Sequence, residues 1–280
     1  MKVLFDARWI YEKPSGIGVY AQEMIRRLPE LLDDWEFVLI FGSEGVKQKY
    51  MESLPEGRKN VEIKVVPLPP TSLKSQLSMP GIIKEIEPDI YHSPNYIVPY
   101  MAFPASTRTQ KTRCVVNIHD VIPLVVTDYA PNSKTSRFKL LYKLCLRQSI
   151  KKSHVIITGS KASQRDISDS LNLPVLQSEK ISVILDGAEI KSDSKKHVPI
   201  KTDDTTPRTL LYVGRMDPYK NVAGLIEAVS IAKNKLPFPV KLVVCGSLDP
   251  RYPEAQIAAD QFGVKDNVVF TDFVPAEELE

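Results

Sequence analysis

The chain has 280 residues, of which 43% are apolar and 25% charged, and its formal net charge is +3. That composition is typical of soluble globular proteins, and the length leaves room for two domains. The net charge is too small to indicate nucleic-acid binding by itself, and the sequence contains no apolar run of the roughly 18 residues that a membrane-spanning helix needs.

The N-terminal residues and the cysteines predict a cytoplasmic protein. Residues 1–16 lack the apolar run and the small-residue cleavage site of a secretory signal peptide. Cys114, Cys145 and Cys245 are odd in number and far apart, which fits neither a disulfide framework nor a zinc site. We therefore expect three reduced thiols.

The first 190 residues predict an α/β domain. Short apolar runs typical of strands occur at residues 2–7, 36–41, 61–66, 89–92, 113–118, 155–158 and 181–185. Helical patterns lie between them at residues 17–32, 45–53, 72–87 and 160–169, the third expected to break at Pro80. This alternation is typical of a mainly parallel sheet with helices on both faces.

A glycine-containing loop precedes the first helix. Gly16 and Gly18 fit the G-x-G-x-x-A pattern of dinucleotide-binding proteins, but residues 8–15 separate them from the first strand, whereas that fold needs a glycine directly after it. A nucleotide-binding oxidoreductase is therefore an alternative that only tight NAD binding would support. The glycines would permit close backbone approach to a ligand at a helix start; the alternative is a loop that merely needs positive φ.

A basic segment follows in the second half of this domain. Residues 129–165 include nine lysines and arginines and no acid, and four of them recur every four residues on a helix predicted over residues 134–151: Lys139, Lys143, Arg147 and Lys151. Phe138, Leu141 and Cys145 are expected to face the core. This basic ridge could contact anionic lipid or a polyprenyl-diphosphate acceptor at the inner face of a membrane; the alternative is an ordinary solvated face.

Residues 191–207 are polar and lack periodicity, which indicates a linker between a domain at 1–190 and a partial one at 208–280. The second domain begins with a strand at residues 209–213, after which Asn221 is a predicted N-cap for a helix. Further strands are expected at 240–245 and 267–271, with a helix at 253–262 between them. Three strands are about half of what a mononucleotide-binding domain of this type requires, roughly five or six.

Arg215 and Lys220 lie in the strand-to-helix turn of that second domain. Open parallel sheets bind ligands at the carboxyl ends of their strands, and a helix N-terminus favours anions. Two cations five residues apart in such a turn suit a diphosphate. The alternative is a pair of solvated loop charges.

His119 is a second candidate, because it follows the strand at 113–118 and precedes Asp120. It could contact a substrate at the crevice edge, or it could be a satisfied structural donor. His92, at the end of the preceding strand, favours a structural hydrogen bond to the adjoining loop.

Five motifs in order resemble glycosyltransferase family 4, the retaining transferases with two Rossmann-like domains (GT-B): Ser15–Gly18, Asp89–Pro94 (DIYHSP), Ile118–Asp120, Lys180–Gly187 (KISVILDG) and Val213–Arg215 followed by Lys220. The resemblance implies transfer of a sugar from a UDP- or GDP-sugar to a polysaccharide or glycolipid acceptor, with retention, in bacterial-type surface polysaccharide synthesis. It places Arg215, Lys220, Gly16 and Gly18 at the donor diphosphate, His119 at the transferred sugar as the catalytic contact, and Ser15 and Asp120 on the acceptor or sugar side.

The family's pair of glutamates, seven residues apart, which holds the donor's ribose and sugar hydroxyls, is missing from this sequence. We therefore expect a C-terminally truncated chain with impaired transfer; the alternative is a non-catalytic fragment or subunit that binds a nucleoside diphosphate. No Asp-x-Asp motif stands out. We expect neither a metal nor a cofactor beyond the nucleotide-sugar substrate.

Overall fold

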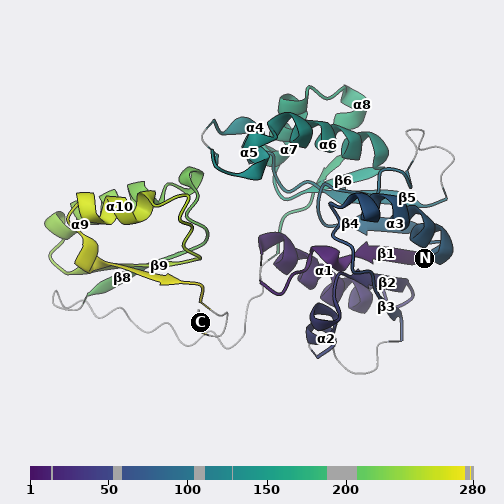
Figure 1. The fold of residues 1–280 in the computed structure, drawn as a ribbon, viewed down its shortest axis with the longest axis horizontal. Helices are drawn as coiled ribbons and strands as arrows, with labels where there is room; N and C mark the ends of the chain where they lie inside the picture. Colours follow the sequence, from purple (N-terminus) through teal and green to yellow (C-terminus); the bar gives the residue numbers. More distant parts are fainter. Residues whose placement is uncertain are drawn as a thin grey trace. The chain divides into compact units, whose positions relative to one another are not determined.

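The computed structural model describes residues 1–13, 15–52, 59–103, 111–127, 129–187, 207–274 and 278. The chain forms two compact units (Figure 1). Met1–Val125 and Lys139–Gly187 make up the first, and Val126–Phe138 and Ala188–Glu280 make up the second. Residues 191–206 of the predicted linker (191–207) lie outside the described residues, and the predicted domain boundaries stay a prediction.

The first unit is built on a seven-stranded parallel sheet in the order β3-β2-β1-β4-β5-β6-β7. Its strands are β1 (Lys2–Asp6), β2 (Glu36–Phe41), β3 (Val61–Val65), β4 (Ile90–Ser93), β5 (Arg113–Asn117), β6 (Val155–Thr158) and β7 (Ile181–Val183). The chain runs outwards from β1 to β3 and then returns to β4 on the other side of β1. This reversal creates a crevice at the carboxyl ends of β1 and β4, where open α/β sheets bind ligands.

Helices cover both faces of this sheet, as the sequence predicts. They are η1 (Ala7–Trp9), α1 (Gly16–Leu31), α2 (Glu44–Glu52), α3 (Leu73–Ile86), α4 (Ile122–Val125), α6 (Lys139–Lys152), α7 (Lys161–Leu171) and α8 (Val175–Ser178). Phe5 packs in a core with α1 and α2, whereas its neighbour Leu4 packs on the opposite face with α3, α6 and α7. Successive strand residues point to opposite faces, so both must be apolar in such a sheet.

Two helix predictions need correction. Helix α3 continues through Pro80, because Met79 and Ile83 are buried on either side of it. Their burial offsets the roughly 3 kcal/mol that an interior proline costs a helix. The helix predicted over 134–151 is two helices, α5 (Lys134–Arg137) in the second unit and α6 in the first.

The core-facing side of α6 also differs from the prediction. Phe138 and Leu141 are exposed and Cys145 is only partly buried. Leu146 and Ile150 face the core instead. Leu140, Leu141 and Leu144 therefore present apolar surface to solvent along the same helix that carries the basic ridge.

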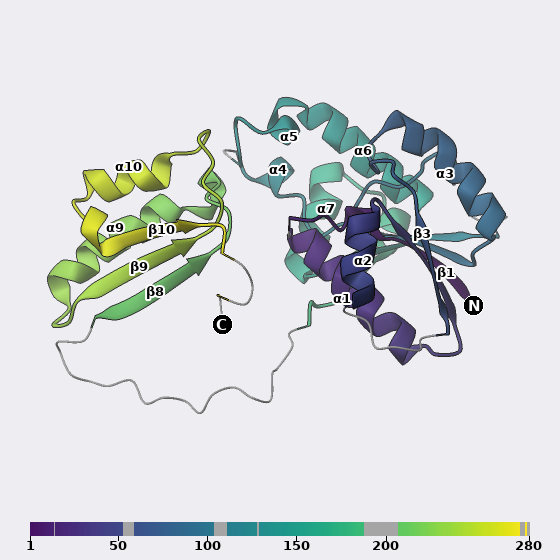
Figure 2. The same cartoon turned by 60° about the horizontal axis from the view of Figure 1, so that its bottom comes forward.

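The second unit is a three-stranded parallel sheet in the order β10-β9-β8. Its strands are β8 (Arg208–Val213), β9 (Val240–Cys245) and β10 (Val268–Asp272), and its other elements are η3 (Pro218–Lys220), α9 (Val222–Lys235), α10 (Glu254–Gln261) and η4 (Lys265–Asn267). Helices α9 and α10 cover one face (Figure 2). Among the described residues, the opposite face is open: Leu211 is 58% exposed, and Val213 and Val269 are also exposed.

A buried ion pair fixes the loop after β1. The Arg8 guanidinium donates to both carboxylate oxygens of Asp6, at 2.7 and 2.6 Å, and also to the carbonyl of Leu68 and the hydroxyl of Ser75. The Tyr91 hydroxyl donates to the same carboxylate at 2.7 Å. Burial and the Asp6 charge raise the pKa of Tyr91, so its hydroxyl remains a donor. The pair thus joins β1 and β4 to the segment that follows β3.

We expect Asp6→Ala to lower the free energy of unfolding of the first unit by about 3–5 kcal/mol, because it leaves Arg8 buried and uncompensated. Both tryptophans, Trp9 and Trp35, lie in this unit, so urea unfolding followed by tryptophan fluorescence isolates its transition. Glu44→Ala, which breaks an exposed ion pair with Lys47, is the control and should cost about 1 kcal/mol or less. Equal losses in the two variants would contradict the role given to the buried pair.

Candidate functional site

Five of the predicted site residues lie in the first unit, at the carboxyl-end side of its sheet. Ser15, Gly16 and Gly18 form the start of α1, which follows β1, and His119 and Asp120 follow β5. The remaining two, Arg215 and Lys220, follow β8 of the second unit. Every candidate therefore occupies the ligand-binding edge of its own parallel sheet.

The start of α1 is a capped helix N-terminus. The Ser15 hydroxyl accepts from the Gly18 amide at 3.1 Å, and the helix begins at Gly16. Neither glycine has a positive φ, so the alternative of a loop that merely needs glycine's freedom is wrong. A Cβ at Gly16 would meet no atom within 4 Å, which leaves the first turn open to a ligand. The glycines lie inside the helix rather than in a turn directly after β1, which argues against a dinucleotide site.

His119 is partly buried and held on two sides. Its Nε2 lies 3.0 Å from the carbonyl oxygen of Pro94, so this nitrogen carries a proton and donates. The edge of its ring meets the ring of Tyr20, with the centroids 5.0 Å apart. These contacts fix the imidazole while its Nδ1 remains an acceptor.

A line of hydrogen bonds behind His119 links β4, β5 and α1. The His92 Nε2 lies 2.7 Å from the Asn117 side-chain oxygen, and the Asn117 amide donates to the Tyr20 hydroxyl at 3.0 Å. The partner of His92 is thus a neighbouring strand rather than the adjoining loop that the sequence favours. Burial raises the pKa of Tyr20, and the nearby Asp186 carboxylate adds to the effect. The Tyr20 hydroxyl therefore keeps its proton for another acceptor.

Asp120 has a local structural contact. Its carboxylate accepts from the Ile122 amide at 3.1 Å and so supports the start of α4, and the residue is exposed. Sequence reasoning does not single out Tyr20 or Asn117, because Asn117 bonds to His92, 25 residues away, and to Tyr20, 97 residues away.

In the second unit, Arg215 is 67% exposed and donates to Asp217 at 2.8 Å. The Asp217 side chain is only 4% exposed, so this carboxylate anchors the guanidinium from beneath while leaving most of it open to solvent. The carbonyl of Arg215 also accepts from the Tyr212 hydroxyl at 2.7 Å. The arginine is therefore held by its backbone and by its side chain.

Lys220 lies in the same turn after β8, at the end of η3. Its ammonium lies 4.9 Å from the centroid of the Tyr219 ring. Burial raises the pKa of Tyr212, and the charge of Lys220 opposes that rise. Asn221 caps α9 by accepting from the Gly224 amide, as predicted. The structure thus brings both cations to one turn at a helix start.

The loop after β9 completes this surface. Hydrogen bonds from Arg251 lower the pKa of Asp249 to about 2, and the Arg215 charge adds to the effect. A Cβ at Gly246 would lie 1.9 Å from the Gly214 carbonyl oxygen, so the loops after β8 and β9 touch backbone to backbone. Across the described parts of the chain, no group of three or more His, Cys, Asp or Glu side chains could hold a metal ion.

The buried His92 generates a pH-dependence prediction. Burial lowers its pKa from 6.5 to about 4. Below pH 6.5, His92 binds a proton in the unfolded chain but not in the folded chain. The free energy of unfolding should therefore fall as the pH drops towards 4. Between pH 7 and pH 5 the wild type should lose about 2 kcal/mol more unfolding free energy than His92→Gln. Urea unfolding by tryptophan fluorescence at both pH values measures this, and parallel pH profiles would refute it.

Comparison with known families assigns both parts of the chain. The model of Glycosyltransferase Family 4 matches residues 14–191, and that of Glycosyl transferases group 1 matches residues 193–280. A curated relative, O-antigen chain mannosyltransferase B of Escherichia coli, is 23% identical over 257 residues, which are 88% of this chain. The chain spans only 64% of the length of that relative.

Solved structures resemble the fold. Anabaena Alr3699/HepE, in complex with UDP and glucose, has a TM-score of 0.62 at 17% identity, covering 98% of this chain and 70% of its own. A glycosyltransferase from Rickettsia africae has a TM-score of 0.57 at 14% identity, covering 98% and 68%. The fold is α/β with two Rossmann-like domains, the GT-B architecture that the motifs predict. With more than half of its residues matched by one family model, the chain belongs to glycosyltransferase family 4.

Proposed function

We propose that this chain transfers a sugar from a nucleotide sugar to a glycan or glycolipid acceptor, with retention of anomeric configuration. The observation that carries the proposal is the exposed turn after β8, where Arg215 and Lys220 gather beside the N-terminus of α9. Two cations and a helix N-terminus match the charge of a diphosphate leaving group.

The two cations would act by stabilising charge. Donor cleavage leaves negative charge on the nucleoside diphosphate, and fixed positive groups lower the energy of that transition state. The Asp217 contact holds Arg215 in place before the donor arrives, which reduces the entropy lost on binding. Because Arg215 and Lys220 supply the charge that a metal supplies in other transferases, we propose metal-independent binding.

Side chains of the first unit would contact the transferred sugar. His119 is fixed by the Pro94 carbonyl and Tyr20, and we propose that its free Nδ1 accepts a hydrogen bond from a hydroxyl of the transferred sugar. The open first turn of α1 would add the Gly16 backbone amide for the donor phosphates, and Gly18, whose amide is bonded to Ser15, would let them approach the backbone closely. Ser15 and Asp120 would flank the acceptor.

The names of related proteins support the ligand class. A UDP and glucose complex is known for one structural neighbour, and the curated relative is a mannosyltransferase of O-antigen chains. We extend a nucleotide-sugar donor and a surface-polysaccharide acceptor to this chain on that basis, in a cytoplasmic location. The alternative is a non-catalytic subunit that binds a nucleoside diphosphate.

We further propose peripheral contact with an anionic membrane through α6. Leu140 is 73% exposed, and Leu141 and Leu144 are exposed beside the basic ridge of Lys139, Lys143, Arg147 and Lys151. Exposed leucines next to lysines and arginines are typical of helices that lie in a lipid interface. Over the described residues, no helix is both long and apolar enough to cross a bilayer.

Arg215→Ala should weaken UDP binding by about 10- to 150-fold, since charge-assisted hydrogen bonds contribute about 1.5–3 kcal/mol. Isothermal titration calorimetry measures the affinity, and Lys233→Ala at the far end of α9 is the matched control. Equal UDP affinities of wild type and Arg215→Ala would refute the diphosphate site.

Two other parts of the proposal have their own measurements. The wild-type affinity for UDP should be the same in EDTA as in Mn²⁺, and NMR of any transfer product tests retention of anomeric configuration.

For the membrane contact, we expect the chain to sediment with anionic liposomes at low salt and to be released at high salt. Replacing Lys143 and Lys151 by alanine should lower partitioning about 30-fold, at about 1 kcal/mol per charge. Leu140→Ser with Leu144→Ser should also weaken binding, whereas Leu77→Ser, on the exposed side of α3, should not. No sedimentation at low salt would leave α6 an ordinary surface helix.

A further inference from the structure

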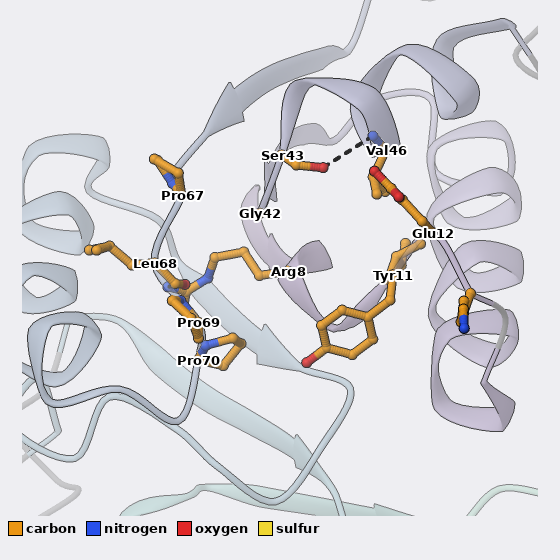
Figure 3. A pocket seen from close by; sticks show the side chains of 12 residues that line it. Arg8, Tyr11, Glu12, Gly42, Ser43, Val46, Pro67, Leu68, Pro69 and Pro70 are labelled. Atoms are coloured by element: carbon orange, nitrogen blue, oxygen red, sulfur yellow. Dashed lines mark hydrogen bonds between the residues drawn. The ribbon is translucent and has the colours of Figure 1, made fainter.

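The first unit contains a cleft that none of the predicted site residues lines. It has a volume of about 470 Å³ and lies where β1, β2 and β3 end, between residues 8–13, residues 42–46 and residues 67–70 (Figure 3). This volume is in the range of small-molecule sites. We call it the Tyr11 cleft. It belongs to the crevice side of the sheet, where ligands of open α/β sheets bind.

The walls of the cleft are formed largely by the rings of apolar side chains. Figure 3 shows the Tyr11 ring on one side and the run from Pro67 to Pro70 on the other. Tyr11 is 52% exposed although it is a large aromatic residue. Burial of its hydroxyl end, together with the Asp6 charge, raises the pKa of Tyr11, so the group remains an uncharged donor. A flat aromatic face with a polar tip suits a ligand that has an apolar face and hydroxyls.

Few polar groups line the cleft, and together they carry no net positive charge. Glu12 lies against the first turn of α2, because a Cβ at Gly45 would be 3.5 Å from its carboxylate oxygen. Ser43 caps the same turn, accepting from the Val46 amide at 3.3 Å. Glu12 and Lys13 have opposite charges. A carboxylate that remains an acceptor suits hydroxyl donors and disfavours a phosphate.

Arg8 also lines the cleft but is not available to bind an anion. Its four hydrogen bonds go to Asp6, Leu68 and Ser75, which occupy most of the five N–H donors of a guanidinium. Its charge is neutralised by Asp6, and the residue is buried. The chemistry of the cleft therefore differs from that of the Arg215 turn, where the cations are exposed.

We propose that the Tyr11 cleft binds an uncharged sugar unit of the acceptor glycan, stacked on the Tyr11 ring and hydrogen-bonded to the Glu12 carboxylate. The assignment to the acceptor rests on the proposed transferase function, while sugar binding itself rests on the cleft alone. Stacking on one ring and hydrogen bonding to a carboxylate select for a neutral polyol over a phosphorylated or acidic sugar.

The test is binding of neutral oligosaccharides to the whole chain, by saturation-transfer NMR and titration at millimolar concentrations. The probes are mannotriose, maltotriose, chitotriose and galactobiose, with mannose 6-phosphate and pyrophosphate as anionic comparisons. Tyr11→Ala should weaken binding of the neutral sugar about 3- to 10-fold, Tyr11→Phe should keep most of it, and Glu12→Gln should weaken it about 10-fold. Met51→Ala, which removes a side chain that is also 52% exposed, is the matched control.

UDP affinity, measured in the same variants, separates this proposal from the transferase function. It should be unchanged in Tyr11→Ala and Glu12→Gln. UDP binding without Tyr11-dependent binding of any neutral probe would overturn the cleft proposal, as would Tyr11-dependent binding that favours mannose 6-phosphate or pyrophosphate. Tyr11-dependent sugar binding without UDP binding would support the cleft as a glycan site and refute the transferase assignment.

Discussion

The buried Asp6–Arg8 ion pair is the contact on which the functional edge of the first unit depends. A charged pair in a core is stable only when nearly all of its hydrogen-bonding capacity is used. Here Tyr91, Ser75 and the Leu68 carbonyl satisfy it, and these partners come from β4, from α3 and from the segment after β3. The loop that leads from β1 to α1 is thereby tied to both sides of the sheet's reversal point.

The two units present different chemistry at equivalent places. In the first, the side chains are hydrogen-bonding groups, such as His119, Tyr20, Tyr11 and the Glu12 carboxylate, which suit hydroxyl-rich molecules. In the second, Arg215 and Lys220 are exposed cations beside a helix start, which suit phosphates. A reaction between a nucleotide sugar and a glycan would need both kinds of recognition, and in this chain each set of side chains follows the strands of a parallel sheet.

The sequence predicts well what local patterns encode. The strands, the cap at Asn221 and the parallel sheet follow from apolar runs, helix-start residues and α/β alternation. It does not reveal the hydrogen bonds from His92 through Asn117 to Tyr20, because strand order and register bring these residues together. The orientation of α6 was missed for a related reason: the apolar residues occur on more than one side of the helix, so periodicity alone does not identify the buried side. The roles of the site residues stay predictions.

The backbone contact between Gly246 and Gly214 limits which substitutions the loops beside Arg215 can accept. Any side chain at position 246 would collide with a carbonyl oxygen and push the two loops apart, moving Arg215 with them. Changes to the surface around Arg215 must therefore be made at other positions of these loops rather than at their closest point. Libraries that randomise position 246 would mostly yield displaced loops, whereas positions 247 to 249, where side chains already occur, leave the loop spacing intact.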